Sequence, residues 1–264
     1  MTASYILPAL FVNWRAESSR RMFPVGRLLN LAGDSYEFAY LAGANQAKEF
    51  GFLPFVAFPE LERVYTSSEL PAFFKNRVLQ PGRPDYAQHL AELGLESATA
   101  SPVAMLARSG GRRVTDPLEV FAELVPSANS DRFETHFFAR GMRHLAGAEA
   151  ALTQLSPGDS LTMQAEPTNP VNPQALLLAG HDTRPVGYVP DYLAEALNEL
   201  AASDPSLSIQ LVRVNAAPSP WQQRLLCRLT LSASAPRPDR GPKFEPIALD
   251  AVRLESVGHV AQVA

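Results

Sequence analysis

The chain has 264 residues, 46% of them apolar, and this length favours two domains over one large core. A net charge of -4 at pH 7 gives no overall basic field, so any recognition of phosphate must be local. The single cysteine excludes an internal disulfide framework, and the five histidines lack the spacing of a zinc site. We therefore expect no metal and no cofactor.

The N-terminal stretch MTASYILPALFV lacks the cationic leader and the small-residue cleavage site of a signal peptide. No apolar run approaches the roughly 20 residues that a membrane-spanning helix needs. Cys227 lies in the apolar stretch RLLCRLTL, which favours a buried side chain that packs as a small hydrophobic group over a reactive thiol. These features predict a soluble cytoplasmic protein with no membrane partner.

The first half of the chain has the pattern of a small α+β unit. Turn residues at 32–35 separate two apolar runs, which predicts a β-hairpin. Three stretches with apolar residues at helical spacing follow, and the last two carry Pro near the start and Gly near the end. In chain order we expect a strand at 5–14, the hairpin at 27–41, helices at 67–79, 83–95 and 101–111, and a strand at 117–125.

The second half is dominated by strand patterns and predicts a mostly antiparallel barrel or curled sheet with one packed helix. We expect strands at 132–142, 160–166, 175–180, 185–189, 206–214 and 224–231, a short helix at 146–155 and an amphipathic helix at 190–200. The stretch APRPDRGPKFEP at 235–246 is too rich in proline and charge to pack, and we expect a linker that leads to a last strand at 247–254. The predicted division is therefore 1–127, 128–234 and 235–264.

The stretch EPTNPVNPQALLL, residues 166–178, places a stiff corner between two apolar strands. Asn and Pro suit such a corner for backbone reasons, because Asn caps its own turn and Pro fixes φ. The same corner is rich in uncharged hydrogen-bonding groups, which suit a ligand. Both interpretations of Asn169 and Asn172 remain open.

The order HFFARGMRHL, GDSLTMQAEPTNPVNPQALLL and PVGYVPDYLAEAL resembles the HIRAN domain over about 132–231. That family has an oligonucleotide-binding-like barrel, and a fork-remodelling helicase in it captures the 3′-hydroxyl end of single-stranded DNA. The resemblance implies that Arg143 lies near a backbone phosphate, that His144 takes the place of a base-stacking aromatic, and that Asn169 is the corner asparagine. Arg143 as a solvated surface charge and His144 as an ordinary rim residue are the alternatives.

The resemblance also places Tyr188 where the helicase has a histidine, and Trp221 in a loop that supplies a second aromatic. Core packing is the alternative for both rings. Two positions depart from the family, since its corner aspartate is Asn172 here and its stacking tyrosine is Val171. An amide oxygen still accepts a hydrogen bond, but a lost aromatic platform costs about 1–3 kcal/mol per base. We therefore expect weak DNA-end binding or a changed ligand.

In the first half, VGRLLNLAGDSYEFAYL, ELPAFFKNRVL and SPVAMLARSGGRRVTDPLEVFAE resemble the small N-terminal subdomain of HipA-type kinases over 25–123. Gln80-Pro81-Gly82 replaces the glutamate-proline signature of that subdomain, and its final proline is missing. No kinase catalytic loop or metal-binding triplet follows, so we expect no enzyme activity. The stretch RSGGRR at 108–113 either cradles a phosphate or simply ends a helix.

Two compatible functions follow from these resemblances. In the first, the HIRAN-like half receives the 3′ end of single-stranded DNA through Arg143, His144, Asn169, Asn172, Tyr188 and Trp221. In the second, the HipA-like half docks on a separate HipA-type kinase core or on a helix-turn-helix antitoxin, as a regulator in a bacterial toxin–antitoxin system.

Overall fold

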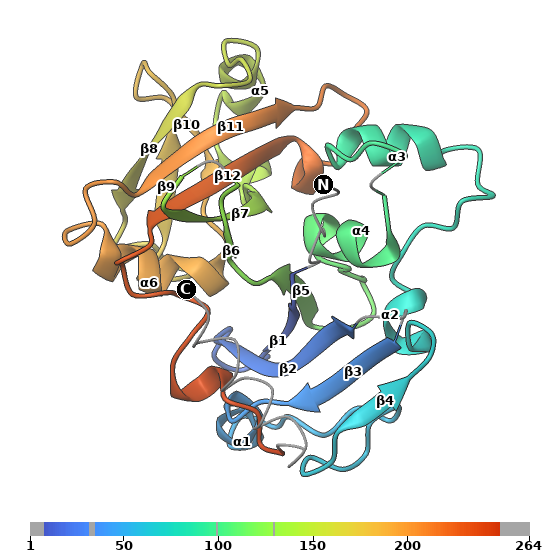
Figure 1. Ribbon diagram of the computed structural model, residues 1–264. Coiled ribbons are helices and arrows are strands. Elements are labelled where there is room, and N and C mark those ends of the chain that lie inside the picture. The colour runs from blue at the N-terminus through green and yellow to red at the C-terminus, as the bar shows by residue number, and fades with distance from the viewer. Residues whose placement is uncertain (1–7, 32–34, 99, 129, 249–264) are drawn as a thin grey trace.

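The computed structural model describes residues 8–31, 35–98, 100–128 and 130–248 (Figure 1). Its strands form a five-stranded sheet of order β4-β3-β2-β1-β5 and a seven-stranded sheet of order β10-β9-β8-β11-β12-β7-β6. Every strand pair is antiparallel, which confirms the prediction of a mixed α+β fold with antiparallel sheets.

The first sheet holds β1 (Leu10–Arg15), β2 (Met22–Leu31), β3 (Ser35–Tyr40), β4 (Tyr65–Ser67) and β5 (Leu118–Ala122). The predicted hairpin is confirmed, because β2 pairs with β3 from Gly26 opposite Tyr40 to Leu31 opposite Ser35. Residues 32–34 of its turn lie outside the described chain. The sheet is larger than the hairpin alone, since β1, β4 and β5 complete it around α1 (Gly43–Lys48).

An aromatic cluster forms the core beneath this sheet. Phe38 stacks on Phe58 with ring centroids 4.1 Å apart, and Phe74 packs beside them. The Tyr40 hydroxyl donates to the carbonyl of Phe58 at 2.7 Å and accepts from the amide of Phe55 at 2.6 Å. Burial raises the pKa of Tyr40, so the neutral phenol fixes the loop at 50–58 against the sheet.

The predicted helix at 67–79 is wrong in extent. Only α2 (Ala72–Lys75) is helical, and Ser67 belongs to β4, opposite Tyr36. Pro71 explains the late start, because a proline keeps the preceding residue out of the helical region. The predicted helices at 83–95 and 101–111 are confirmed as α3 (Tyr86–Glu92) and α4 (Pro102–Ser109).

The second sheet contains β6 (Val125–Pro126), β7 (Arg132–Phe138), β8 (Ser160–Ala165), β9 (Leu176–Ala179), β10 (Pro185–Tyr188), β11 (Ser208–Val214) and β12 (Leu225–Ser232). The main-chain groups of Arg140, just beyond β7, exchange two hydrogen bonds with Tyr188 at 2.8 and 2.9 Å. This bridge joins β10, an edge strand of the sheet, to the end of β7 and closes the sheet into a barrel.

Helix α6 (Asp191–Leu200) covers one opening of the barrel with the predicted apolar face, on which Leu193, Leu197 and Leu200 are buried. Short elements α5 (Ala148–Leu152), η1 (Met142–His144) and η2 (Trp221–Gln223) connect the strands. Cys227 is fully buried in this core, and burial raises the pKa of its thiol, as expected for a packing residue.

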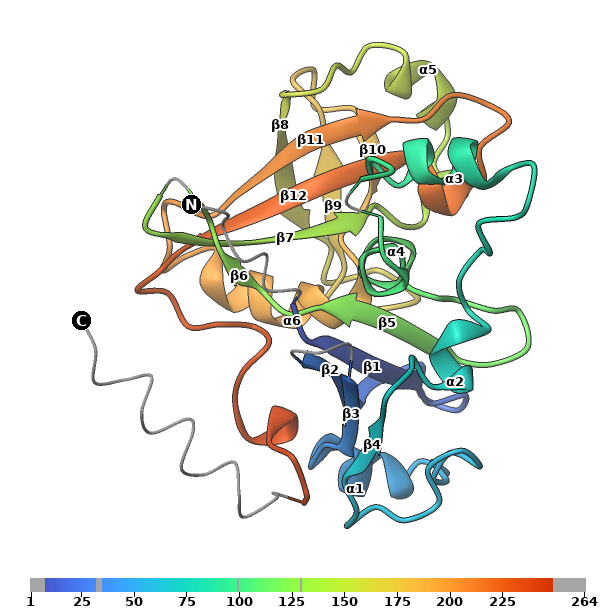
Figure 2. The same cartoon turned by 45° about the vertical axis from the view of Figure 1, so that its right-hand side comes forward.

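The barrel packs directly on the first half of the chain. Leu90, Leu93 and Met105 form one buried cluster with Phe138 and Leu226 of the barrel. Figure 2 shows α6 between the barrel and the first sheet. None of the helices in the described ranges has the length and apolar character needed to cross a membrane.

The segment at 235–246 packs, contrary to the linker prediction. Asp239 is 1% exposed, accepts from the amide of Leu124 at 2.7 Å and is paired with Arg237. Phe244, in η3 (Pro242–Phe244), contacts Phe11 of the first sheet at a centroid distance of 5.1 Å. Charge does not prevent packing here because each buried charge has a partner. The strand predicted at 247–254 lies mostly outside the described residues.

Candidate nucleic-acid interface

The predicted corner joins β8 to β9, and its backbone is closed by hydrogen bonds between Glu166 and Ala175 and between Ala175 and Asn172. The Asn169 side chain lies inside this turn. Its Oδ1 accepts from the amides of Val171 at 2.9 Å and Asn172 at 3.2 Å, and its Nδ2 donates to Glu166 at 2.9 Å. Asn169 therefore has the turn-stabilising role that its residue type favours.

Asn172 has a different position, at the point where the corner meets α6. Its Nδ2 donates to Oδ1 of Asp191 at 2.9 Å, and its own Oδ1 accepts from the amide of Gln174 at 2.9 Å. An amide oxygen has two lone pairs, so the Asn172 oxygen retains acceptor capacity. The same contact brings the exposed carboxylate of Asp191 to the corner.

Tyr188 ends β10 and connects the corner with η1. Burial raises the pKa of its phenol, and a hydrogen bond with Glu166 and the charge of Glu166 raise it further. Its ring lies against Gly141, where an added Cβ would be 2.7 Å from Cδ2 of Tyr188. Gly141 has φ +68°, so both its backbone and its lack of a side chain are required at this contact.

Arg143 and His144 lie on η1, immediately after Gly141, and both side chains are exposed. Nε of Arg143 donates to Nε2 of His144 at 2.9 Å, which requires a neutral imidazole with its proton on the other nitrogen. The two Nη groups of Arg143 make no hydrogen bond or salt bridge with any described residue. They are free to bind an anion such as a phosphate.

Trp221 lies on η2, which contacts η1, and it is half-buried against the barrel core. The guanidinium of Arg224 lies 5.0 Å from its ring centroid, and Arg224 also binds Glu149 at 3.0 Å. One face of the indole is therefore occupied by a cation, which favours the packing alternative for part of this side chain. The guanidinium of Arg140, which precedes η1 in the chain, donates to the carbonyl of Gln222 in η2 at 3.3 Å and so connects η1 with η2.

Four of the six predicted residues, Arg143, His144, Tyr188 and Trp221, lie on elements at the bridge between Arg140 and Tyr188. The other two, Asn169 and Asn172, lie on the corner, which begins at Glu166 near Tyr188. Sequence reasoning missed Arg140, Glu166 and Asp191, which hold the group together. Two of them had a visible signal, since Glu166 opens the corner and Asp191 directly follows the GYVP motif. Val171, at the tip of the corner, is 57% exposed where the family has a stacking tyrosine.

The stretch RSGGRR at 108–113 ends α4. Gly110 has φ 77° and donates its amide to the carbonyl of Leu106, as a left-handed helix C-cap does. The carbonyl end of a helix carries partial negative charge, which disfavours a phosphate held by the backbone of this loop. For the backbone of this loop, the geometry supports the helix-ending interpretation.

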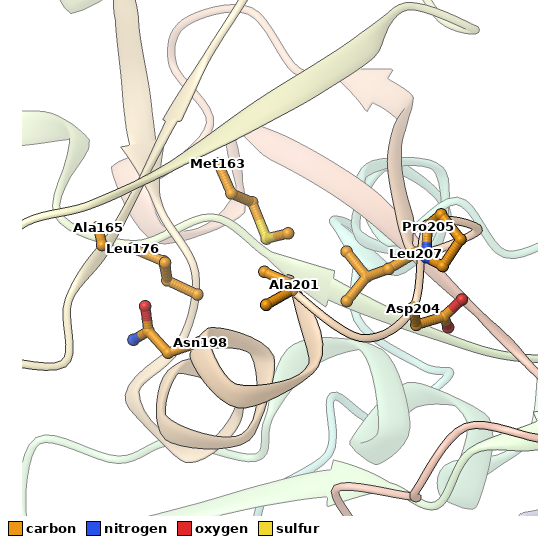
Figure 3. Close-up of a pocket in the computed structure, with 9 residues that line it drawn as sticks. Met163, Ala165, Leu176, Asn198, Ala201, Asp204, Pro205 and Leu207 are labelled. Carbon is orange, nitrogen blue, oxygen red and sulfur yellow. The ribbon is translucent and has the colours of Figure 1, made fainter.

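A hollow of about 550 Å³ lies elsewhere on the barrel, between α6 and strands β8 and β9 (Figure 3). Its polar lining groups are already bonded, since Asn198 donates to the carbonyl of Gln174 at 2.8 Å and Asp204 accepts from Ser206 and from the amide of Ser232. None of the six predicted residues lines it.

The HIRAN domain family matches residues 133–234. Residues 133–234 are a HIRAN domain. This match confirms the resemblance to the HIRAN domain in the second half of the chain. At the family level, HIRAN domains bind nucleic acid. The match does not reach the first half, so the likeness of that half to HipA-type kinases is not supported by it.

Two solved structures are similar to this region at low level. A protein from Lactobacillus plantarum is 18% identical, covers 37% of this chain and 96% of its own, and gives a TM-score of 0.30. The HIRAN domain of human HLTF is 18% identical, covers 37% of this chain and 74% of its own, and gives a TM-score of 0.29. The search of curated proteins gave no match.

Proposed function

We propose that the HIRAN domain of this chain binds single-stranded DNA at a free 3′ end, on the surface formed by η1, Tyr188 and the corner at 166–175. The observation that carries the proposal is the meeting of η1 and the corner at Tyr188. These segments are separated in sequence; the Tyr188 ring lies against Gly141, and Glu166 at the start of the corner is near enough to raise the pKa of the Tyr188 phenol. In this proposal a cation, an aromatic ring and a neutral acceptor share one surface, and these are the groups that a strand end requires.

Each group has a role in this proposal. The free Nη groups of Arg143 bind a backbone phosphate, and the rings of Tyr188 and His144 offer faces to the terminal bases. Oδ1 of Asn172 accepts from the 3′-hydroxyl. Asp191, which is 2.9 Å from Asn172, provides a charged acceptor beside it and offsets the loss of the family's corner aspartate. The chain is a binding protein in this proposal and carries out no chemical step.

A fluorescence anisotropy titration at low salt tests the proposal with single-stranded DNA that ends in either a 3′-hydroxyl or a 3′-phosphate. We expect the 3′-hydroxyl strand to bind about tenfold more tightly, because a terminal phosphate removes the hydroxyl donor and places charge beside Asp191. Asn172→Ala should reduce this preference, and Arg143→Gln should weaken binding to both strands. Equal binding to both ends would refute end capture, and no binding to either would refute the DNA-binding function.

The first half offers a second candidate function, as a docking unit for a HipA-type kinase core or a helix-turn-helix antitoxin. The observation that favours it is the exposure of two apolar side chains on the loop after α1, Leu53 at 79% and Val56 at 100%. Leu53→Ser combined with Val56→Ser should abolish co-purification of such a partner from the native cell. Retention of a kinase or antitoxin by this variant, or its absence from the wild-type eluate, would contradict the docking function.

A further inference from the structure

We propose that Arg112, in the first half of the chain, extends the DNA-binding surface and binds a backbone phosphate beyond the terminal nucleotides. The binding site is then a composite of both halves, and a longer strand gains contacts that a very short one lacks. This inference rests on the proposed function of the HIRAN domain.

Strand β5 of the first half holds the η1 side of the surface. Glu119 of β5 forms a short salt bridge with Nη2 of Arg140, whose backbone is paired with Tyr188. Gly110 lies directly beside Glu119, since a Cβ at Gly110 would be 3.4 Å from its Oε1. Arg112 follows two residues later, on the same loop between α4 and β5.

Strand β5 also holds the corner side of the surface. Phe121 stacks on Tyr192 with ring centroids 4.4 Å apart and an interplanar angle of 20°. Tyr192 follows Asp191, so this stack fixes the start of α6 and the carboxylate that binds Asn172. Figure 2 shows β5 and α4 of the first half next to the start of α6. The loop that bears Arg112 therefore adjoins the proposed binding surface.

Arg112 is within electrostatic range of Glu119 and Asp191 and of two other cations, Arg140 and Arg15. Desolvation by its surroundings lowers the pKa of Arg112. The negative charges of Glu119 and Asp191 oppose this shift, and the positive charges of Arg140 and Arg15 add to it. Glu119 is already paired with Arg140 and Asp191 with Asn172.

The Arg112 side chain is exposed and makes no hydrogen bond or salt bridge within the part of the chain that the structure describes. A bound anion would give the Arg112 guanidinium hydrogen-bond acceptors and a negative charge of its own. A DNA phosphate suits a guanidinium because its oxygens accept two parallel hydrogen bonds.

The experiment compares two 3′-hydroxyl strands, of about 4 and about 16 nucleotides, by anisotropy over a range of salt concentrations. In the wild type the longer strand should bind more tightly and with a steeper salt dependence. Arg112→Gln should weaken binding of the longer strand about three- to fivefold and reduce its salt slope by about 0.7, the value for one phosphate contact on a single strand. It should leave binding of the short strand unchanged.

Arg63→Gln is the matched control, because it removes the same charge beside β4, the sheet edge opposite β5. Arg63 is exposed, forms a salt bridge with exposed Glu60 and lies over the ring of Tyr65, so its loss should affect binding of neither DNA strand. Equal binding of the longer strand by wild type and Arg112→Gln, with equal salt slopes, would overturn the composite site while leaving end capture intact. If the wild type binds neither strand, the proposed function itself fails. Selective binding of RNA over DNA of the same length would also overturn the inference as stated.

Discussion

Gly141 gives the sharpest test of how the η1 surface is built. Replacement by alanine at φ +68° costs about 1–2 kcal/mol for the left-handed backbone. The added methyl would lie 2.7 Å from Cδ2 and 3.3 Å from Cε2 of Tyr188, and such overpacking costs a further 1–3 kcal/mol, roughly. We therefore expect Gly141→Ala to lower the free energy of unfolding by about 2–5 kcal/mol.

Gly147 provides the matched control, because it has φ +77° but no atom within 4 Å of an added Cβ. Gly147→Ala should cost only the backbone term of about 1–2 kcal/mol. Urea unfolding followed by circular dichroism measures both, and an unchanged m-value shows that the unfolded state is unaffected. Adding Tyr188→Ala should reduce the cost of Gly141→Ala to that of Gly147→Ala. Equal costs for the two single variants would refute the contact between Gly141 and the Tyr188 ring as the source of the difference.

Two further predictions concern buried charge. Asp239→Ala should reduce the free energy of unfolding by about 2–4 kcal/mol, because it leaves the amide of Leu124 unpaired and removes a partner of Arg237. Glu60→Ala removes one partner of an exposed salt bridge and should have almost no effect in the same urea assay. Burial lowers the pKa of His136 to about 3, and the nearby charges of Arg108 and Arg228 contribute. As the pH falls below 6.5, the imidazole of His136 is therefore protonated in the unfolded chain before it is protonated in the folded chain. The contribution of neutral His136 to the free energy of unfolding should thus be complete above pH 6.5 and decline toward pH 3. Between about pH 7.5 and pH 5, the free energy of unfolding of the wild type should fall by about 1–2 kcal/mol more than that of His136→Gln. Parallel losses in the two proteins would contradict this prediction.

The elements that the sequence predicted best are those whose signals are local. Ser101, Pro102 and Gly110 mark both ends of α4, and Ser101 Oγ accepts from the amide of Ala104 as a helix cap. The alternating apolar patterns and the corner motif likewise predicted β8, β9 and their connection. Each of these features depends on residues within a few positions of one another, so a single sequence is sufficient to find it.

The features that the sequence missed depend on distant partners. Arg240 and Arg237 pair with Glu123, more than a hundred residues earlier, and no local pattern reveals that their segment packs. The salt bridge between Arg140 and Glu119 crosses from the barrel to the first sheet. Such contacts arise only when both halves are folded, so they were not visible in the residue spacing. The Arg140–Glu119 salt bridge also holds the η1 side of the proposed binding surface in place.

The return of the segment at 235–248 to the first sheet has a practical consequence. The amide of Ile247 donates to the carbonyl of Tyr40 at 2.9 Å, so residues on both sides of the HIRAN domain belong to one sheet region. The domain is therefore an insertion, and isolating it requires two cuts, one of which removes Phe244 from its aromatic neighbours. A single proteolytic nick near residue 128 would leave the two halves associated. Dissection of this protein by truncation would damage the half that it was meant to preserve.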